Sequence, residues 1–165
     1  MGIHLLTRLA AAYGASFPAA GGPAAAFPRA ADLAGADPEA FRHLGFSRSK
    51  GRTLVELAQG VSQGRVDLEK VATMEDEPAV KYLAARRGIG RWSAEYALLR
   101  GLGRWHIFPG DDVGARHKLQ AWLEVPEPLD YQGVSRLLAG FYPFGGLIYF
   151  HFLLSQLAEE GHLAP

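Results

Sequence analysis

Apolar residues recur at three- and four-residue intervals along most of this chain, and alternating runs of β-branched residues are almost absent. This spacing predicts amphipathic helices and an all-α fold. The expected helices span residues 3–14, two short stretches within 29–45, 47–64, 75–85, 91–101, 111–123, 130–141 and 144–161. The Pro/Gly/Ala-rich segment 15–28 is expected to be a loop.

Residues typical of helix ends occur at several of these boundaries. Gly14 is a predicted C-cap, Ser47 a predicted N-cap, and Asp37 before Pro38 is expected to cap the second short helix. In the helix expected at residues 47–64, the residues expected to face inward are Leu54, Leu57, Ala58 and Val61. In the helix expected at residues 75–85 they are Ala79, Tyr82 and Leu83. The last helix is apolar nearly all round, which predicts that it is buried.

Composition narrows the protein class. A length of 165 residues favours one domain, residues 1–165, and the absence of cysteine excludes disulfides, Cys-ligated zinc and iron–sulfur clusters. The first residues lack the pattern of a signal peptide, and no apolar run approaches the roughly 20 residues of a membrane span. We therefore expect a soluble, cytoplasmic protein without a membrane partner, associated with the nucleoid if the source is prokaryotic.

Charge is distributed unevenly although the formal net charge is zero. Residues 81–118 contain eight Lys or Arg and three Asp or Glu, so this segment is basic and the remainder is acidic. A local basic surface attracts a polyanion regardless of the total charge. Chance clustering on a solvated face is the alternative interpretation of this pattern.

A short glycine turn joins two predicted helices inside the basic segment. Gly88 and Gly90 allow positive φ or a close backbone approach, and the helix that follows presents amides without an internal partner. Such a helix start binds a phosphate, and Arg86, Arg87 and Arg91 flank it. A tight helical corner without a ligand would use the same glycines.

Two adjacent acids follow the second of these helices. Pro109 and Gly110 interrupt the chain, and Asp111 and Asp112 precede a new helix. One aspartate is expected to be the N-cap, which leaves the other carboxylate free to point elsewhere. A carboxylate repels a DNA backbone, so its presence here favours a role in stabilising positive charge on a sugar, as in glycoside cleavage.

These motifs together resemble the helix-hairpin-helix (HhH-GPD) DNA glycosylase superfamily, and most of all its DNA-3-methyladenine glycosylase II branch. The motif residues are Leu83, Gly88-Ile89-Gly90, Trp92, Ala94, Leu99-Arg100, Phe108-Pro109 and Asp111-Asp112. The helix-hairpin-helix covers about residues 75–101, and the similarity extends over about residues 5–155. The resemblance implies a multi-helix HhH-GPD glycosylase core.

The resemblance assigns roles to individual residues. Asp112 matches the catalytic aspartate, and Asp111 matches its neighbour, the more probable cap of the two. The amides of Gly88, Ile89 and Gly90 match the turn that holds a DNA phosphate. Carbonyl oxygens at Ala84, Arg86 and Gly88 match a site for a structural Na⁺ or K⁺ ion, and no cofactor is required.

The residue at position 92 distinguishes two reaction types among the glycosylases that this chain resembles. Relatives that also cleave the DNA strand carry a lysine there, whereas this chain has Trp92. The expected activity is therefore monofunctional hydrolysis of alkylated purines, of the 3-methyladenine and 7-methylguanine type, flipped out of double-stranded DNA. Candidates for stacking the base are Trp92, Tyr142 and Phe144, with Trp105 and Tyr149 as further aromatics. His151 matches a family histidine and is expected to be structural, in a buried helix.

The chain also departs from the family pattern. Arg86-Arg87 replaces an apolar residue and proline, and Gly145-Gly146 replaces an Arg-Ser pair. The family's preceding helical segment, which carries a wedge residue, has no counterpart, so a missing N-terminal segment or a second chain is expected to supply it. A catalytically weak DNA-binding module and a helical protein-binding scaffold remain alternatives.

Overall fold

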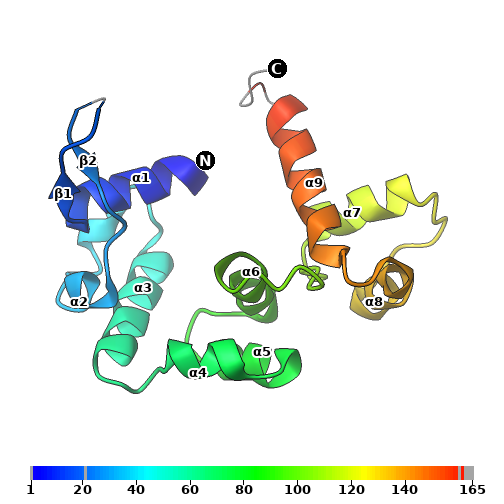
Figure 1. The fold of residues 1–165 in the computed structure, drawn as a ribbon, viewed down its shortest axis with the longest axis horizontal. Helices are drawn as coiled ribbons and strands as arrows, with labels where there is room; N and C mark the ends of the chain where they lie inside the picture. The colour runs from blue at the N-terminus through cyan, green and yellow to red at the C-terminus, as the bar shows by residue number, and fades with distance from the viewer. Residues whose placement is uncertain (1, 21, 160, 162–165) are drawn as a thin grey trace. The chain divides into compact units, whose positions relative to one another are not determined.

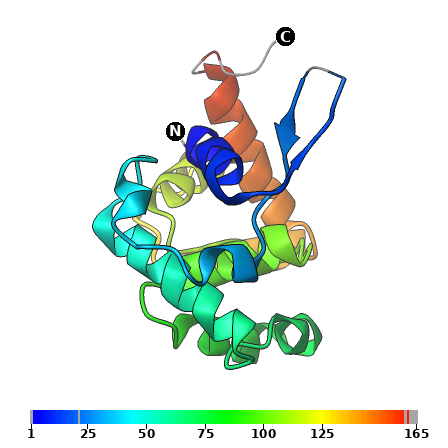
Figure 2. The same cartoon turned by 90° about the vertical axis from the view of Figure 1, so that its left-hand side faces the viewer.

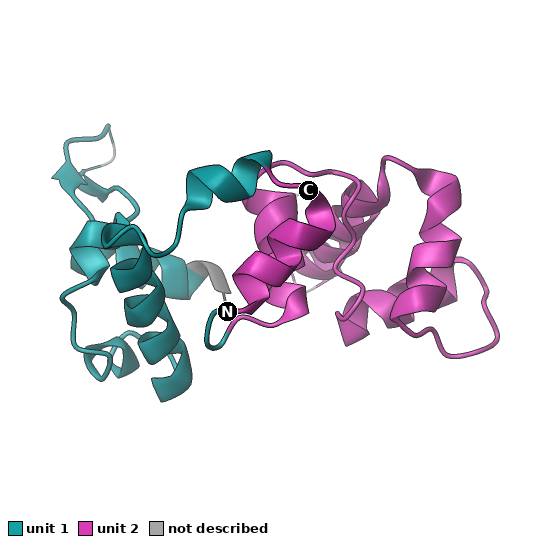
Figure 3. Cartoon of the chain, turned by 90° about the horizontal axis from the view of Figure 1, so that it is seen from below, with its two compact units in different colours: residues 1–73, 86–88 teal, residues 74–85, 89–165 magenta. Residues whose placement is uncertain are grey.

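The computed structural model describes residues 2–20, 22–159 and 161, and it confirms the all-α prediction. The chain forms two compact units, coloured separately in Figure 3, which are described one at a time. Unit 1 comprises residues 1–73 and 86–88, and unit 2 comprises residues 74–85 and 89–165. The single domain expected from the length stays a prediction.

Unit 1 contains four helices, one 3₁₀ turn and one β-hairpin in the described residues (Figure 1). They are α1 (Gly2–Tyr13), β1 (Ser16–Phe17), β2 (Ala24–Ala25), α2 (Ala30–Leu33), η1 (Ala40–Arg42), α3 (Arg48–Ser62) and α4 (Leu68–Thr73). Its core packs α1, α2 and η1 against α3 through Leu9, Leu33, Phe41, Val55 and Ala58. Ser47 caps α3 as predicted, since its Oγ accepts from the amide of Lys50.

Unit 2 contains the helices on either side of the glycine turn and the three that follow (Figure 1). They are α5 (Asp76–Ala84), α6 (Arg91–Gly101), α7 (Val113–Trp122), α8 (Tyr131–Leu138), the 3₁₀ turn η2 (Ala139–Phe141) and α9 (Gly145–Glu159). Leu99, Phe108, Leu119, Val134 and Tyr149 lie in its core, which draws on α6, α7, α8 and α9. This core supports the start of α7, where the acid pair lies.

The predicted loop at residues 15–28 is wrong in part, because it contains a two-stranded antiparallel hairpin (Figure 2). Ser16 pairs with Ala25 and Phe17 with Ala24. Gly14 directly follows α1 as the predicted C-cap, and its amide donates to the carbonyl of Ala10 at 2.7 Å. A Cβ there would also overlap the carbonyl of Ala26, so the position requires glycine for close packing. The segment was predicted as a loop because a pairing this short leaves no hydrophobic period to detect.

Three further predictions need correction. The buried face of α3 centres on Val55 and Ala58, while the other predicted inward residues of that helix are only half-buried. Asp37 lies in a turn, where it accepts from the amide of Glu39, three residues before η1. The helix α4 went unpredicted because its six residues are too short for a clear period.

The predicted burial of α9 is wrong for one stripe of the helix. Gly145, Gly146 and Tyr149 are buried, whereas Leu147, Leu154 and His151 are exposed. Ile148, Phe150, Phe152 and Leu153 also pack against the core of unit 2, so the exposed residues form one stripe along the helix. In the described part of the chain, no single helix is long and apolar enough to cross a membrane, although α8–η2 and α9 pass that test as a bent pair.

Candidate active site

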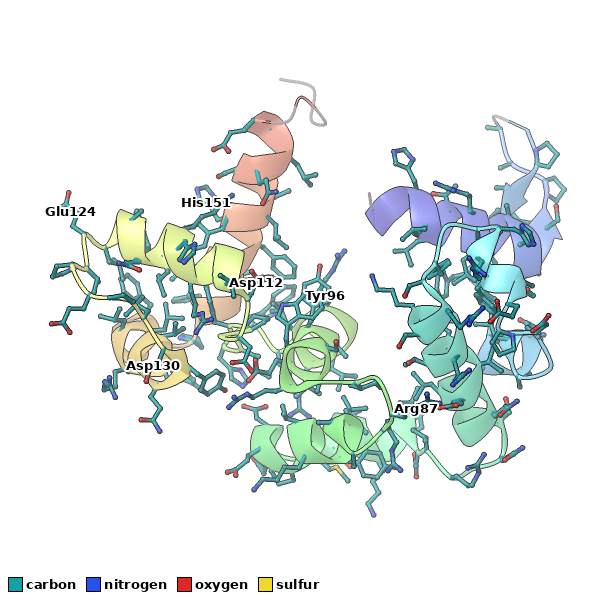
Figure 4. The ribbon with its side chains drawn as sticks, turned by 180° about the vertical axis from the view of Figure 1, so that it is seen from behind. Arg87, Tyr96, Asp112, Glu124, Asp130 and His151 are labelled. Carbon is teal, nitrogen blue, oxygen red and sulfur yellow. The ribbon has the colours of Figure 1, made fainter. Side chains whose placement is uncertain are left out.

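Asp112 lies at the start of α7 (Figure 4), and hydrogen bonds hold both of its carboxylate oxygens. Oδ1 accepts from the backbone amide of Ala115 at 2.9 Å, which caps the helix. Oδ2 accepts from the Tyr149 hydroxyl at 2.7 Å and from the indole Nε1 of Trp92 at 3.2 Å. Three elements, α6, α7 and α9, therefore meet at one carboxylate.

The prediction that Asp111 caps the helix is wrong. Asp112, not Asp111, is the N-cap of α7. Asp111 instead pairs with Arg91, whose Nε donates to Oδ2 of Asp111 at 2.7 Å. The sequence could not separate the two acids, because either is a good cap and only the path of the backbone after Pro109 decides between them. The expectation that one acid caps the helix and the other points elsewhere is confirmed, since Asp111 bonds Arg91 and not the start of α7.

Aromatic packing fixes the two side chains that bond Oδ2. Trp92 lies in the first turn of α6 and stacks on Tyr96 one turn later, with centroids 5.4 Å apart. Tyr149 is 1% exposed, and its ring lies edge-on to Tyr96 at 5.9 Å and to Phe108 at 5.3 Å. Because these rings interlock, the donors to Asp112 have little freedom to move away from it.

The environment of Tyr149 keeps its hydroxyl protonated. Burial raises the pKa of this phenol, and its hydrogen bond to the negative Asp112 raises the pKa further. A neutral phenol is a hydrogen-bond donor, so Tyr149 can bond the carboxylate throughout the physiological range. The sequence predicts Tyr149 only as one of several aromatic candidates, and its spacing from Asp112 gives no indication of this contact.

A second polar network extends from Arg91 into the core. The Arg91 guanidinium lies over the ring of Tyr131, 4.0 Å from its centroid. The Tyr131 hydroxyl donates to Oε1 of Glu95 at 2.6 Å, and Glu95 is only 3% exposed. Burial raises the pKa of Glu95 more than the bond from Tyr131 lowers it. Burial and the adjacent Glu95 raise the pKa of Tyr131 to about 12.

The glycine turn has the geometry expected of its first glycine. Gly88 has φ 77°, in the left-handed region, and a Cβ there would overlap Oγ1 of Thr53. Gly90 is extended, with φ −89° and ψ 175°, and is the N-cap of α6 without a side-chain cap. The first turn of α6 contains no acidic residue, so its amides remain available to an anion.

The arginines predicted to flank this turn have partners of their own. Arg87, which Figure 4 labels, donates to Glu56 at 2.7 Å within unit 1. Arg91 pairs with Asp111, and Arg86 is half-buried. Their contact with a phosphate stays a prediction, as do the carbonyl oxygens of Ala84, Arg86 and Gly88 as ligands of a monovalent ion. The described residues contain no cluster of His, Asp or Glu suited to a metal.

Among the aromatic candidates, only Trp92 and Tyr149 bond the carboxylate in the described structure. Tyr142 is 73% and Phe144 56% exposed, and the ring of Tyr142 lies against His106. Trp105 packs edge-on to Phe150. Trp92 is 41% exposed, so it combines a fixed indole N–H with a partly open face.

Residues 3–143 match the family model described as HhH-GPD superfamily base excision DNA repair protein. The chain belongs to the HhH-GPD superfamily. The match includes the glycine turn, Trp92, Asp111 and Asp112, so the site built around Asp112 lies within the family region, and α9, which carries Tyr149, follows it.

Curated relatives of similar sequence are named as DNA-3-methyladenine glycosylases. The chain is 29% identical over 101 residues to the putative DNA-3-methyladenine glycosylase YfjP of Bacillus subtilis, covering 61% of this chain and 35% of that protein. It is 36% identical over 86 residues to DNA-3-methyladenine glycosylase 2 of Escherichia coli, covering 52% and 30%. The chain thus spans about a third of the length of these two relatives.

Solved structures share the fold over nearly the whole chain. A 3-methyladenine DNA-glycosylase from Archaeoglobus fulgidus superposes with TM-score 0.77 at 28% identity, covering 93% of this chain and 52% of that one. The Schizosaccharomyces pombe 3-methyladenine DNA glycosylase Mag1, solved with abasic DNA, gives TM-score 0.69 at 23% identity, covering 94% and 80%. At that lower identity the likeness shows the fold alone.

Proposed function

We propose that this chain carries the catalytic core of a monofunctional DNA glycosylase, which hydrolyses the N-glycosidic bond of alkylated purines in double-stranded DNA. The observation that carries the proposal is the carboxylate of Asp112, ordered by three hydrogen bonds beside the partly exposed ring of Trp92. The family of the chain and the names of its relatives support the same activity.

The role of Asp112 follows from the chemistry of the bond to be broken. An alkylated purine such as 3-methyladenine is cationic, so it leaves with the electron pair of the glycosidic bond and becomes neutral. The sugar left behind has oxocarbenium character until water adds to its anomeric carbon and loses a proton. A fixed carboxylate stabilises that positive charge in the transition state more than in the ground state, which lowers the barrier.

Trp92 supports hydrolysis without strand cleavage. A lyase reaction needs an amine that attacks the sugar, and the indole of Trp92 cannot form a Schiff base. Within the described residues, Lys118 in α7 donates its Nζ to the carbonyl of Phe152, and no lysine bonds Asp112. The open face of Trp92 suits stacking of an electron-poor base flipped from the helix, with Tyr142 and Phe144 as further stacking candidates.

Binding of DNA would rely on the start of α6. Its amides follow Gly88, Ile89 and Gly90, and a phosphate is favoured there by the helix dipole and by Arg91. Arg86 and Arg87, which precede the glycine turn in the sequence, would add positive charge for the DNA strand that carries this phosphate. A Na⁺ or K⁺ ion on the carbonyls of Ala84, Arg86 and Gly88 belongs to this proposal, and Na⁺-to-K⁺ exchange in binding assays tests it. We further propose a cytoplasmic protein, associated with the nucleoid if the source is prokaryotic, with any wedge residue supplied by another segment or chain.

The deciding experiment measures release of free methylated purine from alkylated duplex DNA under single-turnover conditions. Asp112→Asn is expected to lower the rate at least about 100-fold while DNA affinity is kept. Asparagine still caps a helix well, so this variant should fold. The matched control is Asp111→Asn, which removes the same charge one position earlier and should keep the rate at saturating enzyme within a few-fold.

Two further outcomes define the proposal. Borohydride should trap no covalent complex with DNA, and an abasic product should accumulate uncut; a trapped complex would contradict the monofunctional mechanism. If the parent chain binds duplex DNA in a salt-dependent way but releases no base, the protein acts instead as a DNA-binding module.

A further inference from the structure

We propose that Tyr149 is a positioning residue for the glycosylase reaction, whose hydroxyl fixes the orientation of the Asp112 carboxylate. This inference rests on the proposed function and adds a residue to it. The observations that carry it are the 2.7 Å bond from the hydroxyl to Oδ2 and the near-complete burial of the phenol.

The hydrogen bonds to the Asp112 carboxylate restrict its orientation. An ionised carboxylate offers about four acceptor positions. Trp92 and Tyr149 together fill Oδ2, and the amide of Ala115 takes one position on Oδ1. Oδ1 is thus the oxygen that keeps acceptor capacity for a water molecule or an electron-poor sugar. Rotation of the carboxylate would break bonds on both oxygens at once.

Tyr149 is a firmer donor than Trp92. Trp92 is partly exposed, and its bond to Oδ2 is 3.2 Å, longer by 0.5 Å than that from Tyr149. Tyr149 is 1% exposed and its ring packs against those of Tyr96 and Phe108, so its position is fixed by the core. Such a donor keeps the carboxylate in place when DNA or a flipped base contacts Trp92.

The glycines at the start of α9 explain how Tyr149 reaches the acid. The amide of Gly146 donates to the carbonyl of Trp105 at 2.7 Å, and a Cβ at Gly146 would lie 2.6 Å from that oxygen. Tyr149 follows Gly146 by three positions, on the same face of the helix. The close approach that the glycine permits therefore brings the tyrosine ring beneath the start of α7.

The test compares Tyr149→Phe with the parent chain in the single-turnover release assay. Loss of the hydroxyl alone should lower the release rate at saturating enzyme about 10-fold, with DNA affinity unchanged, because phenylalanine keeps the packing and removes one bond to a charged group. Tyr96→Phe is the matched control: this tyrosine is the neighbouring ring, but its hydroxyl accepts from Arg100. It should leave the rate unchanged.

A double-mutant cycle, measured by urea denaturation, tests the bond between Tyr149 and Asp112 without depending on activity. Tyr149→Phe should lower the urea midpoint in the parent chain, but much less in an Asp112→Ala background, where the partner is already absent. Equal shifts in both backgrounds would overturn the inference, and so would a Tyr149→Phe chain that releases base as fast as an active parent. If the parent releases no base, the proposed function fails, while the cycle still decides whether the bond exists.

Discussion

Arg91, the first residue of α6, pairs with Asp111, twenty positions later, through a 2.7 Å bond from Nε to Oδ2. The pair is partly exposed, and the same guanidinium lies over the ring of Tyr131. Burial lowers the pKa of Arg91 less than the bond to Asp111 raises it. Asp111 is thus a built-in competitor of any phosphate that approaches the start of α6.

Removing that competitor should strengthen DNA binding. Asp111→Asn is expected to tighten binding to duplex DNA a few-fold at low salt, because Arg91 then has no carboxylate partner. Arg91→Ala should weaken binding and reduce the slope of log K against log salt by about 1. Fluorescence anisotropy across a salt series measures both. An unchanged slope in Arg91→Ala would mean that this arginine does not contact phosphate.

The two glycines of the turn should differ sharply in tolerance. Gly88→Ala is expected to lower the free energy of unfolding by about 1–3 kcal/mol, because alanine is strained at positive φ and its Cβ meets Thr53. Gly90→Ala should cost less than about 1 kcal/mol, since its backbone is extended and nothing lies within 4 Å of an added Cβ. Urea denaturation compares the two.

A third variant separates the two causes at Gly88. Adding Thr53→Ala to Gly88→Ala removes the hydroxyl and methyl that crowd the new Cβ but leaves the strained φ. The double variant should therefore recover part of the lost stability. Full recovery would show that φ at this position carries no cost.

The buried bond between Tyr131 and Glu95 should be important for stability. Tyr131→Phe is expected to cost about 1.5–3 kcal/mol, because it removes a hydrogen bond to a carboxylate that is almost fully buried. Thermal unfolding at neutral pH measures the loss. A change below about 0.5 kcal/mol would mean that Glu95 is already protonated or rebonded there.

The pH dependence of Glu95→Gln tests the state of that acid. Because the pKa of Glu95 is raised in the folded protein, the folded state binds more protons, and stability falls as pH rises from about 4.3 through the folded value. Glu95→Gln removes this loss. Its melting temperature relative to the parent should therefore increase with pH over that window and level off above it.

Asp76 should show the opposite dependence on pH. Burial raises the pKa of this carboxyl, but bonds from His106 and Arg104 outweigh burial and lower it overall. Its stabilisation is therefore present above the unfolded value of about 3.9 and lost as pH falls through the folded one. Asp76→Asn should cost about 1 kcal/mol at pH 7, since the pair is partly solvated, and nothing in strong acid.

Periodicity and caps predicted most helix positions because these signals are local. Helix α6 begins at Arg91 and ends at Gly101 as predicted, and Ala79 and Leu83 of α5 are buried. The small hairpin at residues 15–28 and the exposed face of α9 went unpredicted. Both depend on contacts with residues that are distant in the sequence, and the local pattern of apolar residues does not reveal these contacts.

The sequence also predicts only part of the candidate site. Asp112 could be named from the motif around it, but the assignment of the cap to Asp111 was wrong, since either acid has the right chemistry. Tyr149 lies 37 positions from Asp112, on a helix whose pairing with α7 no spacing rule predicts. The partners of Arg87 and Arg91 were missed because surface charges carry no periodic signal.

Gly146 also limits how this sequence can change over evolutionary time. Its added Cβ would meet Leu99 and lie within 2.7 Å of the carbonyl oxygens of Trp105 and Ile107. A serine here could be accepted only after the segment around residue 106 had shifted. The glycine and the tyrosine three positions later are therefore expected to be inherited together, so that in related chains a larger residue at the first position should accompany the loss of the second.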